Sequence, residues 1–131
     1  MTKTETKQEY KDLEGDPQIK ARVRAIQLET ARKRMLADIP TADVVVTNPD
    51  HLAIALKYDR QEAAPKVVAK GRNHLAEKIK QIARQARVPV IENKPLARLL
   101  FPQVKVGEFI PENLYQAVAE VLAYVYRLRK A

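Results

Sequence analysis

The tetrapeptide Asn48-Pro49-Asp50-His51 combines residue types that can break a peptide bond without an outside reagent. An Asn usually decays when the backbone N–H of the next residue attacks its side-chain carbonyl, but Pro49 has no N–H. The remaining reaction is attack by the side-chain amide nitrogen of Asn48 on the backbone carbonyl of the same residue. Expulsion of the Pro49 nitrogen then breaks the chain and leaves a succinimide at the new C-terminus.

This cleavage is slow unless the fold assists it, because an amide nitrogen is a poor nucleophile. Holding Asn48 in a reactive rotamer lowers the barrier, and a turn that twists the tertiary Asn48–Pro49 amide weakens its resonance. His51 can carry a proton from the side-chain amide to the leaving nitrogen, which is typically worth roughly 10²- to 10⁴-fold in rate. Asp50 can orient His51. The same residues are also ordinary turn residues, so a purely structural interpretation stays open.

The composition excludes several other kinds of chemistry. The chain of 131 residues has no Cys, which excludes a disulfide scaffold and a thiolate zinc site. It has no Ser, and its three Gly residues are isolated, so serine hydrolases and glycine-rich phosphate loops are excluded too. We therefore expect no cofactor and no metal. Because no apolar run reaches about 18 residues and no secretory leader is present, we expect a soluble protein of a reducing compartment.

Short strands are predicted on both sides of the tetrapeptide. Val44–Val46 is a β-branched run typical of a buried strand, and Leu52–Tyr58 alternates large and small apolar side chains. The simplest arrangement is two strands joined by Asn48–His51. Val67-Val68 and Val88–Ile91 are two further strand candidates.

A helix is predicted from about Arg72 to Arg87. Apolar side chains recur on one of its faces at helical spacing: Leu75, Ile79, Ile82 and Ala86. Its outer side carries Glu77 and five basic residues: Arg72, Lys78, Lys80, Arg84 and Arg87. With 24 Lys and Arg against 16 Asp and Glu, the chain has a net charge of +8, which suits phosphate groups of nucleic acid or anionic lipid. An aromatic content of 5% gives little base stacking, which argues against nucleic acid.

Two helices are predicted in the last third of the chain. Asn93 is expected to cap the first, with Pro95 in its first turn and three Leu side chains inward: Leu96, Leu99 and Leu100. Pro111 is expected to open the second, where apolar residues recur at spacings of four, three, four and three: Leu114, Val118, Val121, Val125 and Leu128. Residues 40–131 are therefore predicted to form a small α/β domain, with a central sheet of about four short strands covered by helices.

Residues 1–39 are predicted to form a long helical linker arm before this domain. Asp16 is expected to cap a helix that begins at Pro17. Its apolar stripe is thin: Ile19, Val23, Ile26 and Thr30. A thin stripe buries little surface, so the arm is expected to be solvated. A marginal terminal helix is an equally open interpretation.

Several blocks of the chain resemble one known family. The run Asp43–His51 resembles the signature of the FlhB/YscU family, the self-cleaving switch components of type III secretion export gates. The similar blocks cover essentially the whole chain: Glu14–Lys20, Arg32–Met35, Val44–Tyr58, Ala64–Gly71, Pro95–Arg98 and Ile110–Leu128. Ala64–Gly71 and the final helix are more similar to the flagellar branch than to the injectisome branch.

The resemblance implies that residues 1–39 join a membrane domain absent from this chain. Residues 40–131 would be the autocleaving export-switch domain, at the cytoplasmic face of the bacterial inner membrane. The family implies a single cleavage between Asn48 and Pro49, not an enzyme with turnover, and the two pieces then stay paired in one sheet. The broken loop lets export change from rod and hook substrates to filament substrates.

The resemblance also implies partners. These are rod, hook and filament proteins, a hook-length control protein, other export-gate components and the export ATPase complex, with no nucleic acid expected. Export substrates would dock on an apolar surface, for which the matching positions are Ala64, Pro65, Ala119 and Leu122. Core packing is the alternative interpretation and is favoured for Leu122.

The chain departs from the family at Asp50, where the family usually has Thr. Asp keeps the acceptor capacity of Thr, loses its hydroxyl donor and adds a charge beside the cleavage site. We expect cleavage to be retained, at an altered rate. The alternative function is a basic nucleic-acid- or anionic-lipid-binding module that uses the helix over residues 72–87.

Overall fold

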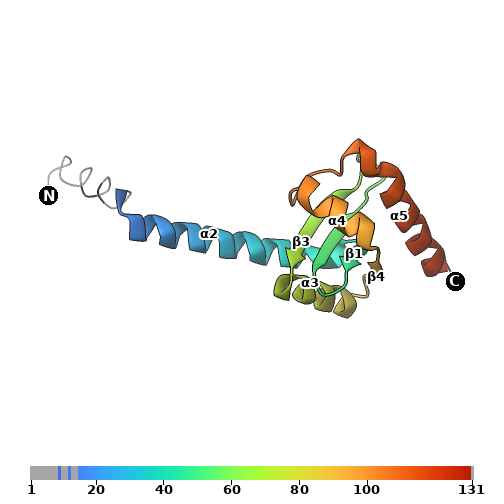
Figure 1. Cartoon of the computed structure of the whole chain (residues 1–131), viewed down its shortest axis with the longest axis horizontal. Helices are drawn as coiled ribbons and strands as arrows, with labels where there is room; N and C mark the ends of the chain where they lie inside the picture. The colour runs from blue at the N-terminus through green and yellow to red at the C-terminus, as the bar shows by residue number, and fades with distance from the viewer. Residues whose placement is uncertain (1–8, 10–11, 13–14, 131) are drawn as a thin grey trace. The chain divides into compact units, whose positions relative to one another are not determined.

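The computed structural model of the chain describes residues 9, 12 and 15–130 (Figure 1). Predictions that fall on the remaining residues of the arm, and on residue 131, lie outside the described residues. The chain divides into two compact units, Met1–Arg34 and Met35–Ala131. The helix α2, Pro17–Asp38, supplies most of the described part of the first unit and the first residues of the second.

The described part of the first unit is a charged helix, as the sequence predicts. The Asp16 carboxylate accepts a 2.8 Å hydrogen bond from the backbone N–H of Gln18, which confirms the predicted cap. Val23 and Ile26 remain 47% and 54% exposed, so the thin apolar stripe of this helix is solvated.

The second unit is built on a four-stranded mixed sheet in the order β3-β2-β1-β4. The strands are β1 (Val44–Asn48), β2 (Leu52–Lys57), β3 (Lys66–Arg72) and β4 (Val90–Glu92). β2 runs antiparallel to both β1 and β3, whereas β4 is parallel to β1. This confirms the predicted sheet of about four short strands.

Helices cover both faces of the sheet (Figure 1). Because successive strand residues point to opposite faces, Val44 and Val46 pack with one set of helices and Val45 with another. The first face is covered by α4 (Lys94–Gln103) and α5 (Tyr115–Lys130), and the second by α3 (His74–Gln85). Every residue of β1 is buried as a result.

Two short 3₁₀ turns complete the second unit. They are η1 (Ile39–Thr41), which follows α2, and η2 (Glu112–Leu114), which precedes α5. Pro111 therefore opens η2, and α5 itself begins at Tyr115. Asn93 caps α4 as predicted, its side chain accepting a 3.2 Å hydrogen bond from the backbone N–H of Leu96.

The helix predicted from Arg72 begins later, at His74. Arg72 continues β3 and pairs with Leu52, and Asn73, with φ 53°, makes the turn into the helix. Lys80, predicted on the outer side of this helix, is 7% exposed and forms a 2.6 Å ion pair with Glu77.

Leu99, which was predicted to face inward, and Leu128, the last residue of the predicted apolar stripe, are each 49% exposed. The buried face of α4 is centred on Leu96, Ala97 and Leu100, which leaves Leu99 on its flank. Leu128 lies one turn beyond Val125, the last buried residue of α5. The fourth strand begins at Val90, later than the predicted Val88–Ile91. Pro89 precedes it and contributes its carbonyl oxygen, which accepts a hydrogen bond from the Val45 N–H.

Candidate functional site

The tetrapeptide of interest forms the tight turn between β1 and β2. Asn48 is the last residue of β1 and pairs with Leu52, the first residue of β2. The backbone N–H of His51 donates a 3.0 Å hydrogen bond to the Asn48 carbonyl oxygen, which closes a four-residue β-turn. Asp50 has φ 63°, and a Pro followed by a left-handed residue is the pattern of a type II turn.

Neighbouring strands and loops hold this turn on both sides. The backbone N–H of Asn93 donates to the Thr47 carbonyl at 2.9 Å, and that of Asn73 donates to the His51 carbonyl at 3.0 Å. Asn48 is only 6% exposed, although its neighbours Asp50 and His51 are exposed. Asn48 is therefore largely enclosed by its neighbours, and restricted side-chain freedom is the feature that the cyclisation expected from the sequence would use.

A hollow of about 450 Å³ opens beside Asn48 on the second unit. Its lining residues come from β1, β2, the end of β3, α4 and the turns after β1 and β3: Asn48, His51, Leu52, Arg72, Asn73, Arg98, Phe101 and Pro102. The structure thus brings Asn48 and His51 to one hollow, whereas Pro49 and Asp50 are not among its lining residues.

Sequence reasoning did not assign Arg72, Arg98 or Phe101 to this site. The Arg72 guanidinium lies 4.6 Å from the centre of the Phe101 ring, and the Lys70 ammonium lies 4.7 Å from it. The Lys70 ammonium also donates a 2.7 Å hydrogen bond to the Phe101 carbonyl. Burial, and next the Arg72 charge, lower the pKa of Lys70. The sequence indicated Arg98 only as part of the block Pro95–Arg98 and Arg72 only as part of a basic helix, and neither pattern connected them with Asn48.

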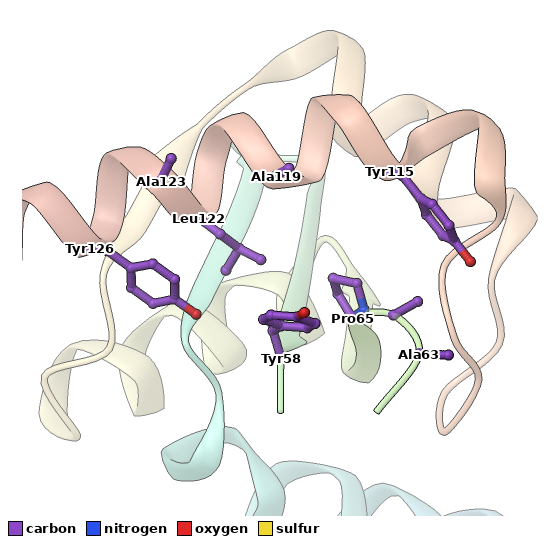
Figure 2. A pocket seen from close by; sticks show the side chains of 9 residues that line it. Tyr58, Ala63, Pro65, Tyr115, Ala119, Leu122, Ala123 and Tyr126 are labelled. Atoms are coloured by element: carbon purple, nitrogen blue, oxygen red, sulfur yellow. The ribbon is translucent and has the colours of Figure 1, made fainter. Parts of the chain in front are cut away.

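A second, apolar pocket of about 330 Å³ lies beside α5 (Figure 2). It brings together all four predicted docking positions: Ala64, Pro65, Ala119 and Leu122. Figure 2 shows Leu122 directed from α5 towards Pro65 and Tyr58, with Tyr115 and Tyr126 at either end. Leu122 is 5% exposed and also belongs to the core, whereas Ala119 is exposed.

The basic surface that the alternative function requires on the helix predicted over residues 72–87 carries fewer cations than the sequence indicated. Of its five cations, Arg72 lies in β3 above Phe101, and Lys80 is buried against Glu77. Within the part of the chain that the structure describes, no three His, Asp or Glu side chains form a cluster that could hold a metal ion.

Comparison with known proteins decides the family. The sequence matches the family model described as the FlhB HrpN YscU SpaS Family over residues 1–125. The chain belongs to this family. It is 49% identical over 131 residues to the flagellar biosynthetic protein FlhB of Bacillus subtilis (strain 168), covering 99% of this chain and 36% of that protein. It is 52% identical over 130 residues to the FlhB of Helicobacter pylori (strain ATCC 700392 / 26695), with the same coverage of 99% and 36%.

Solved structures of this FlhB-type family have the same fold. The cytoplasmic domain of FlhB from Shewanella putrefaciens superposes with a TM-score of 0.73 at 46% identity, covering 76% of this chain and 77% of that one. A mutated EscU C-terminal domain, in which an Asn is replaced by Ala, gives a TM-score of 0.67 at 32% identity, covering 70% of this chain and 92% of that one.

The chain spans about a third of the length of the curated relatives it matches, from 34% to 37% for several of them. None of the helices in the described residues combines the length and the apolar character that a membrane crossing needs.

Proposed function

We propose that this chain is the cytoplasmic domain of a flagellar type III export component and that it cleaves itself once, between Asn48 and Pro49. The observation that carries the proposal is the geometry of the turn. A buried Asn precedes a Pro, and the Asn carbonyl is held by the N–H of His51 at 3.0 Å. The flagellar relatives and the FlhB cytoplasmic domain, to which the chain is similar, support the assignment to export.

The proposed reaction begins with attack of the Asn48 side-chain nitrogen on the Asn48 backbone carbonyl carbon. A C–N bond forms, negative charge develops on the carbonyl oxygen, and the His51 N–H already donates to that oxygen. The bond between this carbon and the Pro49 nitrogen then breaks. The nucleophilic nitrogen loses one proton and the Pro49 nitrogen gains one, so the step needs no co-reactant. The products are a C-terminal succinimide and a new N-terminus at Pro49.

In the proposal, the His51 imidazole moves that proton. This side chain lines the same hollow as Asn48, and its exposure lets it exchange protons with water. Asp50 is next to it and exposed, and in the proposal it orients His51.

The cut pieces are expected to remain together. Five residue pairs join β1 to β2, from Val44↔Leu56 to Asn48↔Leu52, and β1 also pairs with β4. β1 is therefore an inner strand that belongs to the N-terminal piece, and both of its neighbours belong to the C-terminal piece. Its removal would expose the core, so the new freedom is confined to the turn. In the proposal, this loosened turn permits the change from rod and hook substrates to filament substrates.

The apolar pocket beside α5 is the proposed docking site for export substrates. Its lining offers exposed Ala119 and half-buried Pro65 beside three tyrosines, which suits a short apolar segment. The proposed partners are rod, hook and filament proteins, a hook-length control protein, other export-gate components and the export ATPase complex. The proposed location is the cytoplasmic face of the inner membrane, where an N-terminal membrane domain would anchor the protein.

The proposed cleavage and switch can be tested in cells that carry the full-length protein. Asn48→Ala is expected to block cleavage and to reduce filament-protein export while hook-protein export continues. Asn113→Ala, which changes another Asn of the same domain, is the matched control and is expected to leave both exports unchanged. Normal filament export by a verified uncleaved Asn48→Ala protein would contradict the proposed switch.

A further inference from the structure

We infer that the hollow beside Asn48 is a carboxylate-binding site, in which Arg72 and Arg98 hold the α-carboxylate that cleavage leaves on Asn48. This inference rests on the proposed self-cleavage and adds what happens to its product. The partner of the site is thus a segment of the same chain in its cut form.

The sheet register places Arg72 in line with the cleavage site. Asn48 pairs with Leu52 on β2, and Leu52 pairs with Arg72 on β3, so the three residues form one row across the sheet. Directly paired residues point to the same face, and two strand spacings separate the ends of the row by about 10 Å. The side chains of Asn48 and Arg72 therefore rise from the same face of the sheet, and both residues line the hollow. Leu52 packs on the side that α4 covers, and α4 carries Arg98.

Among the described residues, neither guanidinium group has an anionic partner in the uncut chain. The ion pairs among the described residues are Lys33–Glu29, Lys66–Glu62, Lys80–Glu77 and Arg129–Asp43, and none involves Arg72 or Arg98. The Phe101 ring fixes the Arg72 guanidinium at 4.6 Å, and Lys70 adds a third cation 4.7 Å from the same ring. The lowered pKa of Lys70, caused by burial and then by Arg72, is consistent with this excess of positive charge.

Cleavage supplies the missing negative charge. Water opens the succinimide at the former backbone carbonyl, where a C–O bond forms and the ring C–N bond breaks. The Asn48 carboxamide is restored, and its α-carboxyl group loses a proton at neutral pH, while the Pro49 amine gains one. An arginine binds a carboxylate with two parallel hydrogen bonds, whereas the uncut chain offers only a neutral peptide. The hollow therefore favours the product over the reactant.

This asymmetry determines which side of the cut becomes mobile. The carboxylate would fix the end of β1 against β3 and α4, so Asn48 keeps its place in the sheet. Pro49 and Asp50 do not line the hollow, so these two residues would become mobile after the cut. The cut turn is thus expected to loosen only on its C-terminal side.

The test compares Arg variants in cut and uncut protein. Arg98→Gln and Arg72→Gln are each made in the self-cleaved wild type and in uncleavable Asn48→Ala, and thermal unfolding is measured at one protein concentration. Both arginines are exposed, so we expect each substitution to lower the unfolding temperature by about 1–4 °C beyond its effect in the uncut background. Arg127→Gln, on the exposed end of α5, is expected to act equally in both backgrounds. Equal effects of Arg72→Gln and Arg98→Gln in cut and uncut protein would overturn the inference.

A second measurement works even if the wild type stays uncut. Inorganic phosphate added to the Asn48→Ala protein is expected to shift the side-chain Nε–H NMR signals of Arg72 and Arg98, and self-cleavage to reduce that shift because the carboxylate occupies the site. An uncut wild type with a phosphate shift would overturn the proposed cleavage and leave the anion site standing. No phosphate shift in uncut protein would overturn the site itself.

Discussion

The backbone N–H of His51 donates a 3.0 Å hydrogen bond to the carbonyl oxygen of Asn48, the same carbonyl that the proposed reaction attacks. One residue thus offers two distinct groups, a backbone donor for the developing oxyanion and an imidazole for proton transfer. Replacing the side chain removes the second group and keeps the first.

The first prediction follows from this division. His51→Ala is expected to slow cleavage by roughly 10²- to 10⁴-fold without abolishing it, because the backbone N–H remains. The rate is measured at neutral pH from the mass of intact and cut chains over time. His74→Ala, at the other His of the chain, is the control and is expected to cleave at the wild-type rate. A His51→Ala protein that cleaves as fast as the wild type would remove the imidazole from the mechanism.

The second prediction concerns the backbone of Asp50, which has φ 63°. Gly and Asn adopt this left-handed region readily, whereas a β-branched residue is strained there. In uncleavable Asn48→Ala protein, Asp50→Asn is expected to leave stability unchanged, and Asp50→Val to destabilise the fold by about 1–2 kcal/mol. Urea unfolding measures both. A fully stable Asp50→Val protein would show that the turn does not need a left-handed residue.

The third prediction concerns Gly71. A Cβ atom there would lie 2.5 Å from Leu75 Cγ and 2.9 Å from Leu75 Cβ, so the side chain of Leu75 would have to move. Gly71→Ala is expected to destabilise the protein by about 1–3 kcal/mol. Gly15→Ala is the matched control, because nothing lies within 4 Å of a Cβ at that position. Equal urea midpoints for the two variants would contradict the close approach of β3 and α3.

The fourth prediction separates docking from packing in the pocket beside α5. Ala119→Glu adds a charge to an exposed position and is expected to abolish capture of export substrates at unchanged stability. Leu122→Ala is expected to cost about 2–5 kcal/mol in folding free energy, because Leu122 is 5% exposed and packs in the core. Tyr124→Ala, on the outer side of α5, is expected to affect neither. Unimpaired capture by Ala119→Glu would place docking elsewhere.

The fifth prediction concerns the pH dependence of stability. The hydrogen bond from Lys80, more than the nearby charges, lowers the pKa of Glu77 below its usual 4.5. A folded-state pKa below the unfolded value means that the contribution to stability is present above pH 4.5 and is lost as the pH falls through the folded value. Urea midpoints measured below pH 4.5 should therefore fall less steeply in Glu77→Gln than in the wild type. Identical slopes would contradict a role for this pair.

The strands were predictable because their residues are buried on both faces. Val44–Val46 is apolar without interruption, as a strand covered by helices on either side requires. The ends of helices were less predictable. The residues around Arg72 do not indicate whether it ends a strand or begins the following helix. Its pairing with Leu52 on β2 makes it a strand residue.

The candidate cleavage residues could be proposed from the sequence for a chemical reason, whereas their surroundings could not. Asn-Pro is a pattern that a sequence displays directly. Arg72, Phe101 and Arg98 reach the same hollow from β3 and α4, so their proximity to Asn48 is a property of the sheet order and the packing of α4. The docking positions were carried over from the family, and their common pocket appears only in the fold.

Intact-mass analysis of the purified protein tests the central claim most directly. At neutral pH the account predicts two pieces, Met1–Asn48 and Pro49–Ala131, with an early form of the first piece lighter by one water because it ends in the succinimide. Asn48→Ala is expected to stay whole. Acid is avoided because the Asp16–Pro17 bond is itself acid-labile and would give pieces of other masses. A wild-type chain that stays at its full mass after prolonged incubation would contradict the account.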